Sequence, residues 1–224
     1  MYDVSNITAL GPIKELEPGT TLLISGPVMS GKRGLALEFL AQGSKNNEAS
    51  IVISTDKDAE SILEEYEETT GDSEPSKFGA GIGVIDCYGS GKSGENDNPT
   101  RRIRHVSSPS DLTGLSIQIS ELIEEFEDAA GIRIAMVSVS TLLMYLDTET
   151  VFKFIHVFVS RIRNADGVAF FVLDSSSVEP TTLSTLKQPF DGVIEVRETD
   201  EGDGREIRVV GLKPQPTEWS SIEA

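Results

Sequence analysis

The sequence predicts an α/β fold in which helices cover both faces of a mostly parallel central sheet, giving three layers. Short runs of β-branched and other apolar residues recur along the chain, as in parallel strands that are buried on both faces. Longer amphipathic stretches fill the intervals, as expected for connecting helices. No polar linker is long enough to separate two cores, so we expect one domain over residues 1–224.

The expected strands and helices alternate along the chain. Strands are predicted at residues 21–25, 50–54, 81–86, 133–139 and 168–174. Helices are predicted at residues 32–42, 58–69, 111–129, 149–164 and 182–186. Alternation with period two around Glu201-Gly202-Asp203-Gly204 predicts an antiparallel hairpin over residues 192–211 at the edge of the sheet. Residues 1–19 form an N-terminal segment, and residues 88–107 are expected to be an exposed loop.

The stretch from Thr20 to Leu40 joins a predicted strand, a glycine loop and an amphipathic helix. Gly26, Gly31 and Lys32 match the G-x-x-x-x-G-K part of a phosphate-binding loop. Glycines let successive N–H groups turn inward, and the start of the helix adds positive potential at the same place. An ordinary strand, turn and helix is the alternative. The residues predicted to bind the phosphates of a nucleotide, with ATP as the candidate cofactor, are Gly26, Pro27, Val28, Met29, Ser30, Gly31, Lys32 and Arg33.

Arg33 stands where the pattern has Ser or Thr, whose hydroxyl binds Mg²⁺. Two alternatives remain open for its guanidinium. It can bind phosphate oxygens through its planar fork of donors, or it can turn outward to an acidic neighbour. A second glycine-lysine match, residues 89–93, has Asp86 in place of the first glycine and runs into a polar stretch that cannot begin a helix. We therefore predict no phosphate site there.

Several segments carry a family resemblance. The sequence resembles the KaiC-like ATPases of the RecA superfamily, and most of all their small single-domain haloarchaeal members, which are described as HTR-like or signal-transduction ATPases. The segments that carry the resemblance are GPVMSGK, ISTDKDAESIL, IRIAMVSVSTLLMYLD, VAFFVLDSSSVE and FDGVIEVRE. The resemblance covers nearly the whole chain. It implies a RecA-like fold with a nucleotide site at the glycine loop.

The chain departs from that family where the resemblance implies residues for Mg²⁺ and for water activation. The family has an aspartate at the end of the strand that precedes the STLL segment, and this chain has Val137. The family has paired glutamates after the second strand, and this chain has Asp56 and Lys57. Asp56 can activate water or cap the helix that begins near Asp58. Because Arg33 and Val137 offer no ligand atom, we expect no tight Mg²⁺ site and weak or absent ATP hydrolysis.

Charged residues indicate the partners to consider. The net charge of −18 is spread along the chain, which predicts a surface suited to strong salt; the alternative is a basic partner. The resemblance implies that a basic residue of a neighbouring subunit reaches the nucleotide, and Lys213 matches its place; the alternative is an exposed lysine at a strand end. Arg101, Arg102, Arg104 and His105 form a basic cluster that weakly indicates nucleic-acid binding.

The function expected from the sequence is a nucleotide-binding regulatory or signal-transduction protein, a pseudo-ATPase that acts through a protein partner or a homo-oligomer. A slow active ATPase and a recombination-mediator-like protein associated with nucleic acid are the alternatives. No segment approaches the roughly 20 apolar residues that span a bilayer, which predicts a cytoplasmic protein without membrane contact. Cys87 is the only cysteine, so an intrachain disulfide is excluded and a buried inert thiol is expected.

The dispersed acidic residues predict that salt stabilises the protein. Repulsion among the 37 acidic groups is screened over about 3 Å at 1 M salt but over about 10 Å at 0.1 M. The melting temperature should therefore keep rising with KCl well beyond about 0.15 M, and any homo-oligomer should dissociate at low salt before the monomer melts. Thermal melts and analytical ultracentrifugation across one KCl series measure both. A melting temperature that does not change between about 0.1 M and about 2 M would contradict the prediction.

Overall fold

The computed structural model describes residues 1–7, 10–71, 80–89, 100–199, 204–213 and 217–222. Its strands are β1 (Tyr2–Asp3), β2 (Glu15–Leu16), β3 (Thr21–Gly26), β4 (Ala49–Ser54), β5 (Gly81–Asp86), β6 (Arg101–His105), β7 (Ile132–Met136), β8 (Val168–Asp174), β9 (Gly192–Glu198), β10 (Arg205–Val210) and β11 (Ser220–Ile222). Its helices are α1 (Lys32–Ser44), α2 (Ala59–Thr70), α3 (Leu112–Glu125), α4 (Val139–Tyr145), α5 (Thr148–Asn164), the short 3-10 helix η3 (Ser175–Ser177) and α6 (Pro180–Lys187).

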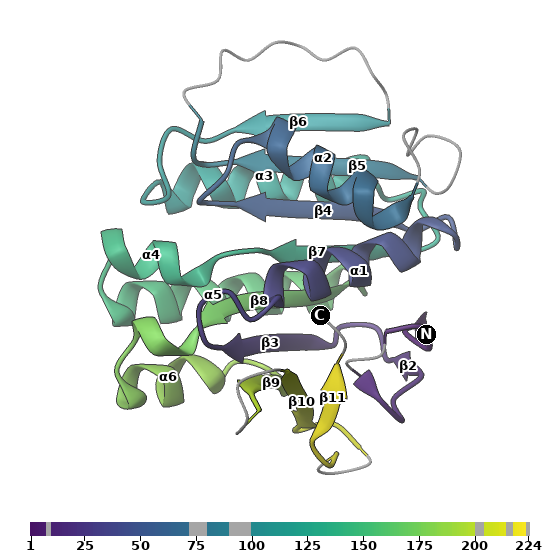
Figure 1. Cartoon of the computed structure of the whole chain (residues 1–224). Coiled ribbons are helices and arrows are strands. Elements are labelled where there is room, and N and C mark those ends of the chain that lie inside the picture. Colours follow the sequence, from purple (N-terminus) through teal and green to yellow (C-terminus); the bar gives the residue numbers. More distant parts are fainter. Residues whose placement is uncertain (8–9, 72–79, 90–99, 200–203, 214–216, 223–224) are drawn as a thin grey trace.

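A nine-stranded sheet forms the centre of the fold, with the strand order β11-β10-β9-β3-β8-β7-β4-β5-β6 (Figure 1). Every pairing from β9 to β6 is parallel, and β10 and β11 add antiparallel strands beside β9. The predicted α/β class, the mostly parallel sheet and the hairpin at its edge are therefore confirmed. The short β1 and β2 form a separate antiparallel pair within the N-terminal segment.

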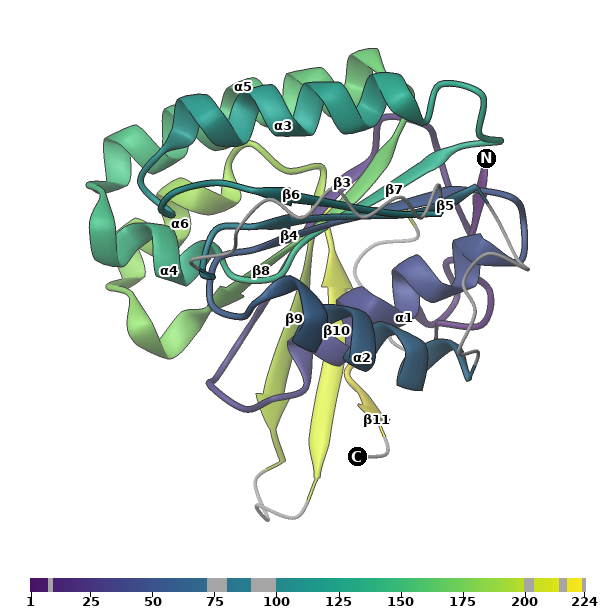
Figure 2. The same cartoon turned by 90° about the horizontal axis from the view of Figure 1, so that it is seen from above.

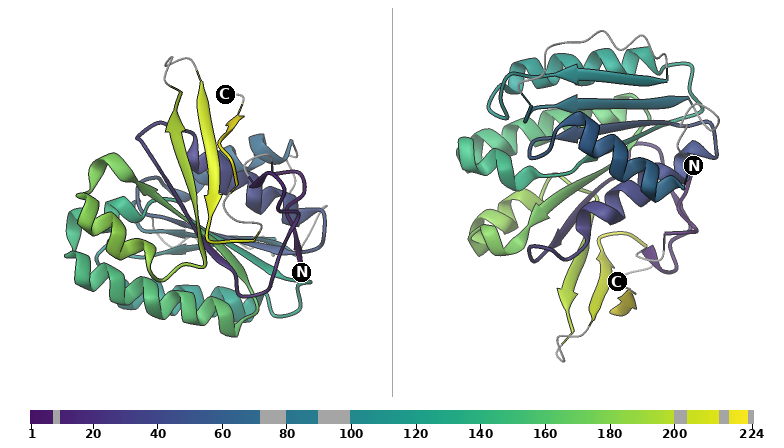
Figure 3. Two further views of the ribbon diagram at one scale, coloured as in Figure 1. Left: turned by 90° about the horizontal axis from the view of Figure 1, so that it is seen from below. Right: turned by 45° about the horizontal axis from the view of Figure 1, so that its top comes forward.

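Helices cover both faces of the sheet (Figure 2). The helices α1 and α2 pack together on one face, and α3 and α5 lie on the other. Two short helices, α4 and α6, contact α5 at the carboxyl ends of the strands. The β9–β10 hairpin projects away from the sheet on the side of α1 and α2 (Figure 3). It therefore lies beside the start of α1.

Each face of the sheet has its own apolar core. Side chains that alternate along the strands belong to one core or the other, as the pleat of a strand requires. Phe170 stacks on Phe39 of α1 with ring centroids 3.8 Å apart, whereas the next residue, Phe171, meets Phe158 of α5 on the opposite face at 5.4 Å. All six residues of β3 are buried, so this strand is held by both cores. The strand that leads into the glycine loop is thus one of the best-buried parts of the fold.

A buried arginine connects several elements at the amino ends of the strands. The guanidinium of Arg133 is fully buried, forms an ion pair with Glu48, and donates to the carbonyl oxygens of Phe39 at 2.9 Å and Asp3 at 2.8 Å. Its plane also lies over the ring of Phe39, 4.9 Å from the centroid. Burying an unpaired guanidinium would be costly, and these partners offset that cost.

Two expectations about the elements are wrong. The loop expected over residues 88–107 includes the strand β6, which pairs in parallel with β5 at the edge of the sheet; residues 90–99 lie outside the described residues. The arginines of β6 led to the prediction of an exposed loop, but in the structure they form ion pairs with acidic side chains of neighbouring helices. The strand expected over residues 133–139 ends at Met136, because Ser138 accepts a hydrogen bond from the Thr141 N–H and caps α4.

The remaining boundaries differ less. The helix α3 ends at Glu125, short of the expected Ala129, because Phe126 turns out of the helix with φ −104°. The helix α6 is longer than expected and begins with a proline at its first position, where the missing N–H costs nothing. Residues 200–203, the expected hairpin turn, lie outside the described residues, although the Thr199 N–H donates to the Gly204 carbonyl at 3.0 Å. Among the described helices, none is long and apolar enough to cross a bilayer.

Two glycines of α1 allow a matched test of the buried Arg133. A Cβ on Gly43 would lie 2.6 Å from the Arg133 Nε, whereas a Cβ on Gly34 would meet nothing within 4 Å. Gly43→Ala should therefore destabilise the fold by about 1–3 kcal/mol through overpacking. Gly34→Ala should stabilise it by about 0.5–1 kcal/mol because alanine is the better helix former. Urea unfolding of both variants measures this. A stabilising Gly43→Ala would show that the ion pair moves aside freely.

Candidate functional site

The glycine loop, residues 26–31, leaves the carboxyl end of β3, which lies between β9 and β8. The chain leaves β3 toward α1 on one face of the sheet, and it leaves β8 toward α6, which packs with α5 on the other face. Adjacent parallel strands whose connections diverge in this way open a crevice between their carboxyl ends, and ligands of α/β proteins bind at such points. The sequence-predicted loop therefore lies at the place where the topology favours a ligand site.

The loop backbone is tightly turned. Gly31 precedes α1 with φ 77°, and Met29 has φ 61°, a left-handed conformation that residues other than glycine seldom adopt. Gly26 lies so close to the hairpin that a Cβ there would be 2.8 Å from the Val196 Cβ. The Val28 and Met29 side chains are exposed, whereas Ser30 is buried. The loop is thus shaped by Gly26 and Gly31 and presents its backbone around the start of α1.

Lys32 turns back into this loop. Its side chain is only 4% exposed, and its Nζ lies 2.7 Å from the Asp174 Oδ1 and 3.1 Å from the Ser30 Oγ. It also donates to the carbonyl oxygen of Pro27. These contacts place the ammonium group between the loop and the end of β8, where the Asp174 carboxylate neutralises its charge.

Asp174 is a site residue that the sequence reasoning did not identify. It is the last residue of β8 and is paired in register with Gly26 of β3. Its N–H donates to the Ser140 Oγ of α4 at 2.8 Å, and its side chain stays about a third exposed. The available signal was an acidic residue at the end of an apolar strand, since the carboxyl ends of neighbouring parallel strands meet at one edge.

Arg33 points away from the loop. Its guanidinium forms an ion pair with Asp56 and lies 3.9 Å from the Glu65 Oε1, which also pairs with Lys57. Of the two alternatives for Arg33, the structure therefore shows the one with acidic neighbours. Burial raises the pKa of the Asp56 carboxyl above its usual value, although the nearby Arg33 opposes that rise. The expectation that Asp56 caps a helix is wrong, because the cap of α2 is Asp58, which accepts from the Ser61 N–H at 3.0 Å.

Two positions near the loop that the resemblance assigns to magnesium ligation carry no ligand oxygen. Val137 is 2% exposed and offers no side-chain oxygen, and Arg33 stands where a hydroxyl would be needed. Asp56 is engaged by Arg33. Across the part of the chain that the structure describes, no three His, Cys, Asp or Glu side chains gather closely enough to hold a metal ion. Mg²⁺ is commonly held by one or two carboxylates together with substrate phosphates and water, and the carboxylate found beside the loop, that of Asp174, is paired with Lys32.

A comparison with protein families identifies one match. A family of unknown function, DUF7504, matches residues 19–196. The chain belongs to this family. The match begins just before β3, includes the glycine loop, Asp56 and Asp174, and ends at Val196 of β9. A comparison with curated proteins found no match.

The arginines of the basic cluster in this DUF7504 chain pair with carboxylates within the fold. Arg101 pairs with Glu67, and Arg102 and Arg104 both pair with Glu125. The His105 Nδ1 lies 3.5 Å from the Asp86 Oδ2. Arginines that are paired with carboxylates attract phosphate less than unpaired arginines do, so the structure gives little support to nucleic-acid binding by this cluster.

Lys213 lies away from the loop, and most of the second glycine-lysine match lies outside the described residues. Lys213 is exposed and follows β10, which runs antiparallel to β9 and so carries it toward the amino ends of the parallel strands. Within one chain it is therefore at the opposite end of the sheet from Lys32. Of the second match, residues 90–93 lie outside the described residues, while the Gly89 N–H donates to Asp86 at 2.8 Å.

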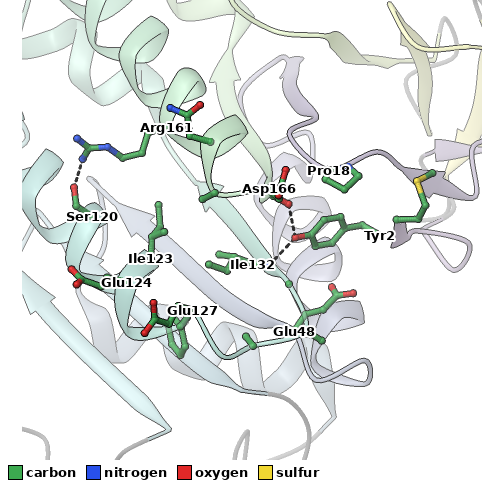
Figure 4. A pocket seen from close by; sticks show the side chains of 17 residues that line it. Tyr2, Pro18, Glu48, Ser120, Ile123, Glu124, Glu127, Ile132, Arg161 and Asp166 are labelled. Carbon is green, nitrogen blue, oxygen red and sulfur yellow. Dashed lines mark hydrogen bonds between the residues drawn. The ribbon is translucent and has the colours of Figure 1, made fainter.

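A cavity of about 700 Å³ lies at the amino ends of the strands, at the opposite end of the sheet from the glycine loop. Figure 4 shows the side chains that line it. Glu48, Glu124, Glu127 and Asp166 contribute carboxylates to its lining. The Tyr2 hydroxyl, at one side, accepts from the Ile132 N–H at 3.0 Å and donates to a backbone oxygen at 2.9 Å. The Tyr2 hydroxyl is thus engaged within the protein, as is Glu48, which pairs with Arg133.

Cys87 is buried, as the sequence predicted. Burial, together with the neighbouring carboxylates of Asp86 and Asp111, raises the pKa of its thiol to about 12. The thiolate, which is the nucleophilic form, is therefore scarce at neutral pH. A nucleophilic role for this residue is disfavoured.

The Arg33–Asp56 pair predicts a double-mutant effect. Arg33→Gln should lower stability by about 1 kcal/mol, because it leaves a partly buried carboxylate without its cation. Adding Asp56→Asn should restore part of the loss, since no charge then remains to be desolvated. Without Arg33 the pKa of Asp56 should rise further. The single variant should therefore lose stability as pH rises through the unfolded aspartate pKa of about 3.9 toward the higher folded value.

Urea unfolding of the wild type, both single variants and the double variant measures the coupling between the two residues. Equal stabilities of the Arg33→Gln variant with and without Asp56→Asn would mean that water already solvates the carboxylate.

Proposed function

We propose that this chain binds the phosphates of a nucleotide, with ATP as the candidate, at the glycine loop and acts as a regulatory protein with little or no hydrolysis. The observation that carries the proposal is the buried Lys32, whose ammonium group lies inside a glycine loop at the start of a long helix. A cation beside the start of a helix favours a bound anion.

The start of α1 supports this proposal because no side chain caps it. Its N-cap residue is Gly31, whereas α2, α3 and α5 begin with Asp58, Asp111 and Asp147, each accepting from a backbone N–H. The first N–H groups of a helix need a partner from outside the helix. Phosphate oxygens would supply that partner at α1, where a carboxylate supplies it at α2, α3 and α5 and a hydroxyl supplies it at α4. The helix α6 also lacks a side-chain cap.

Weak hydrolysis is expected from the residues that stand at the positions of the metal ligands and of the water-activating base. Phosphoryl transfer relies on a metal ion to neutralise charge on the phosphates, and on a base or polar group to orient water. Here Arg33 and Val137 replace the two expected ligands of the ion, and Asp56 is engaged by Arg33. The residues present can hold phosphate but are poorly equipped to transfer it.

Asp174 affects how tightly the loop can bind an anion. An incoming phosphate must compete with this carboxylate for the Lys32 ammonium, which lowers affinity for any anion. The same carboxylate favours a slow ATPase as the second candidate, because it is an acidic group beside the loop that can accept a proton from water. Turnover measurements distinguish the two candidates.

A titration with fluorescent ATP, in high KCl and with or without Mg²⁺, tests the proposal. ATP should bind, and Mg²⁺ should change the affinity less than about threefold because the ion finds few ligands. Lys32→Ala should weaken binding by about tenfold or more, and Asp174→Asn should strengthen it several-fold by removing the competing charge. Lys45→Ala, at the exposed far end of α1, is the control for the loss of one lysine.

Two outcomes would contradict the proposal. Absence of ATP binding, or binding that Lys32→Ala leaves unchanged, would remove the nucleotide site from the loop. Steady ATP hydrolysis that disappears in the Lys32→Ala variant would instead establish the second candidate, an active ATPase.

A further inference from the structure

The β9–β10 hairpin touches the glycine loop at two positions. A Cβ on Gly26 would lie 2.8 Å from the Val196 Cβ of β9, and a Cβ on Gly31 would lie 2.9 Å from the Arg205 Nη1 of β10. Both glycines of the loop thus face this hairpin. The second contact places a guanidinium directly beside the residue that begins α1.

The alternation of β10 explains why Arg205 points toward the loop. Ile207 and Val209 are buried in the core on the α1 side of the sheet. Arg205 lies two residues before Ile207 and therefore on the same face of the strand. Because β10 runs antiparallel to β9, its first residue lies at the carboxyl end of the parallel strands, level with the loop. The pleat and the strand direction together aim this side chain at the start of α1.

Arg205 differs from the other hairpin arginines in its partners. Arg197 pairs with Glu206 at 2.7 Å, and Arg208 pairs with Glu195 at 2.7 Å. Both also lie over the ring of Trp219. For the Arg205 side chain, no hydrogen bond or ion pair is found among the residues that the structure describes. Arg205 is half-buried, and although Glu198 lies opposite it in the register of β9 and β10, no ion pair between the two is found among the described residues. Its guanidinium therefore has donors available for another anion.

We propose that Arg205 is a phosphate-binding residue of the glycine loop, contributed by the same chain. This inference rests on the proposed function and adds a second cation to the proposed phosphate site. Lys32 approaches the loop from the side of β8, and Arg205 approaches Gly31 from the hairpin. The planar fork of a guanidinium binds two phosphate oxygens at once, whereas an ammonium acts as a point charge. The ligand class is an oligophosphate with at least two phosphates, either free or as part of a nucleotide.

Arg205→Gln, Arg205→Lys and Arg208→Gln test this proposal, with ATP and inorganic tripolyphosphate as probes in separate calorimetric titrations at one KCl concentration. Arg205→Gln should weaken both probes about tenfold, the loss expected for a charge-assisted hydrogen bond. Arg205→Lys should fall between that variant and the wild type, since it keeps the charge and loses the fork. Arg208→Gln removes the same charge from the same strand and should change either affinity less than about twofold.

The two probes separate this inference from the proposed function. Lys32-dependent ATP binding that Arg205→Gln leaves unchanged would overturn the inference and leave the function intact. Tripolyphosphate binding that needs Arg205, without ATP binding, would support phosphate binding by Arg205 and overturn the proposal that the ligand is a nucleotide. Binding of neither probe by the wild type would overturn both. Equal losses from Arg205→Gln and Arg208→Gln would also overturn the inference, because only net charge would then matter. Matching melting temperatures of the variants exclude unfolding as the cause.

Discussion

The register of β3 against β8, which pairs Gly26 with Asp174, is the constraint on which the candidate site depends. Side chains alternate between the faces of a sheet, so a slip of one residue would move Asp174 to the other face and break its contact with Lys32. Aromatic packing holds the register on both sides. Phe170 stacks on Phe39, and Phe171 contacts Phe158 and Phe190 with centroids 5.4 and 4.9 Å apart. The polar contact at the strand ends is thus positioned by apolar contacts within the sheet.

Much of this architecture was predictable because the parallel strands are buried on both faces. Uninterrupted apolar runs predicted β5 and β8 at the observed residues and β3 and β4 to within one residue. The expected hairpin was found because its solvent-facing and core-facing residues alternate in sequence. The glycine loop was found because its residues are contiguous. Local patterns therefore predicted the elements that are defined by local burial or local turns.

The missed features depend on residues far apart in the chain. The strand β6 carries three arginines, and its pairing is understandable only with Glu67 of α2 and Glu125 of α3 beside it. The helix α4 interrupts a β-branched sequence because Ser138 caps it locally, which overrides the strand propensity of Val137 and Val139. Asp174 and Arg205 approach the loop from strands that follow it by more than a hundred residues. A linear pattern contains no sign of such contacts until the strand order is known.

The charges around the loop also separate into two groups with different consequences. Arg33, Asp56, Lys57 and Glu65 pair with one another between α1 and α2. Lys32 and Arg205 remain at the loop, with Asp174 as the only carboxylate found paired to either of them among the described residues. Cations fixed to the chain stabilise bound phosphate in the ground state as well as during reaction, and uniform stabilisation does not accelerate chemistry. On the proposed function, this charge arrangement favours retention of a phosphate ligand over its turnover.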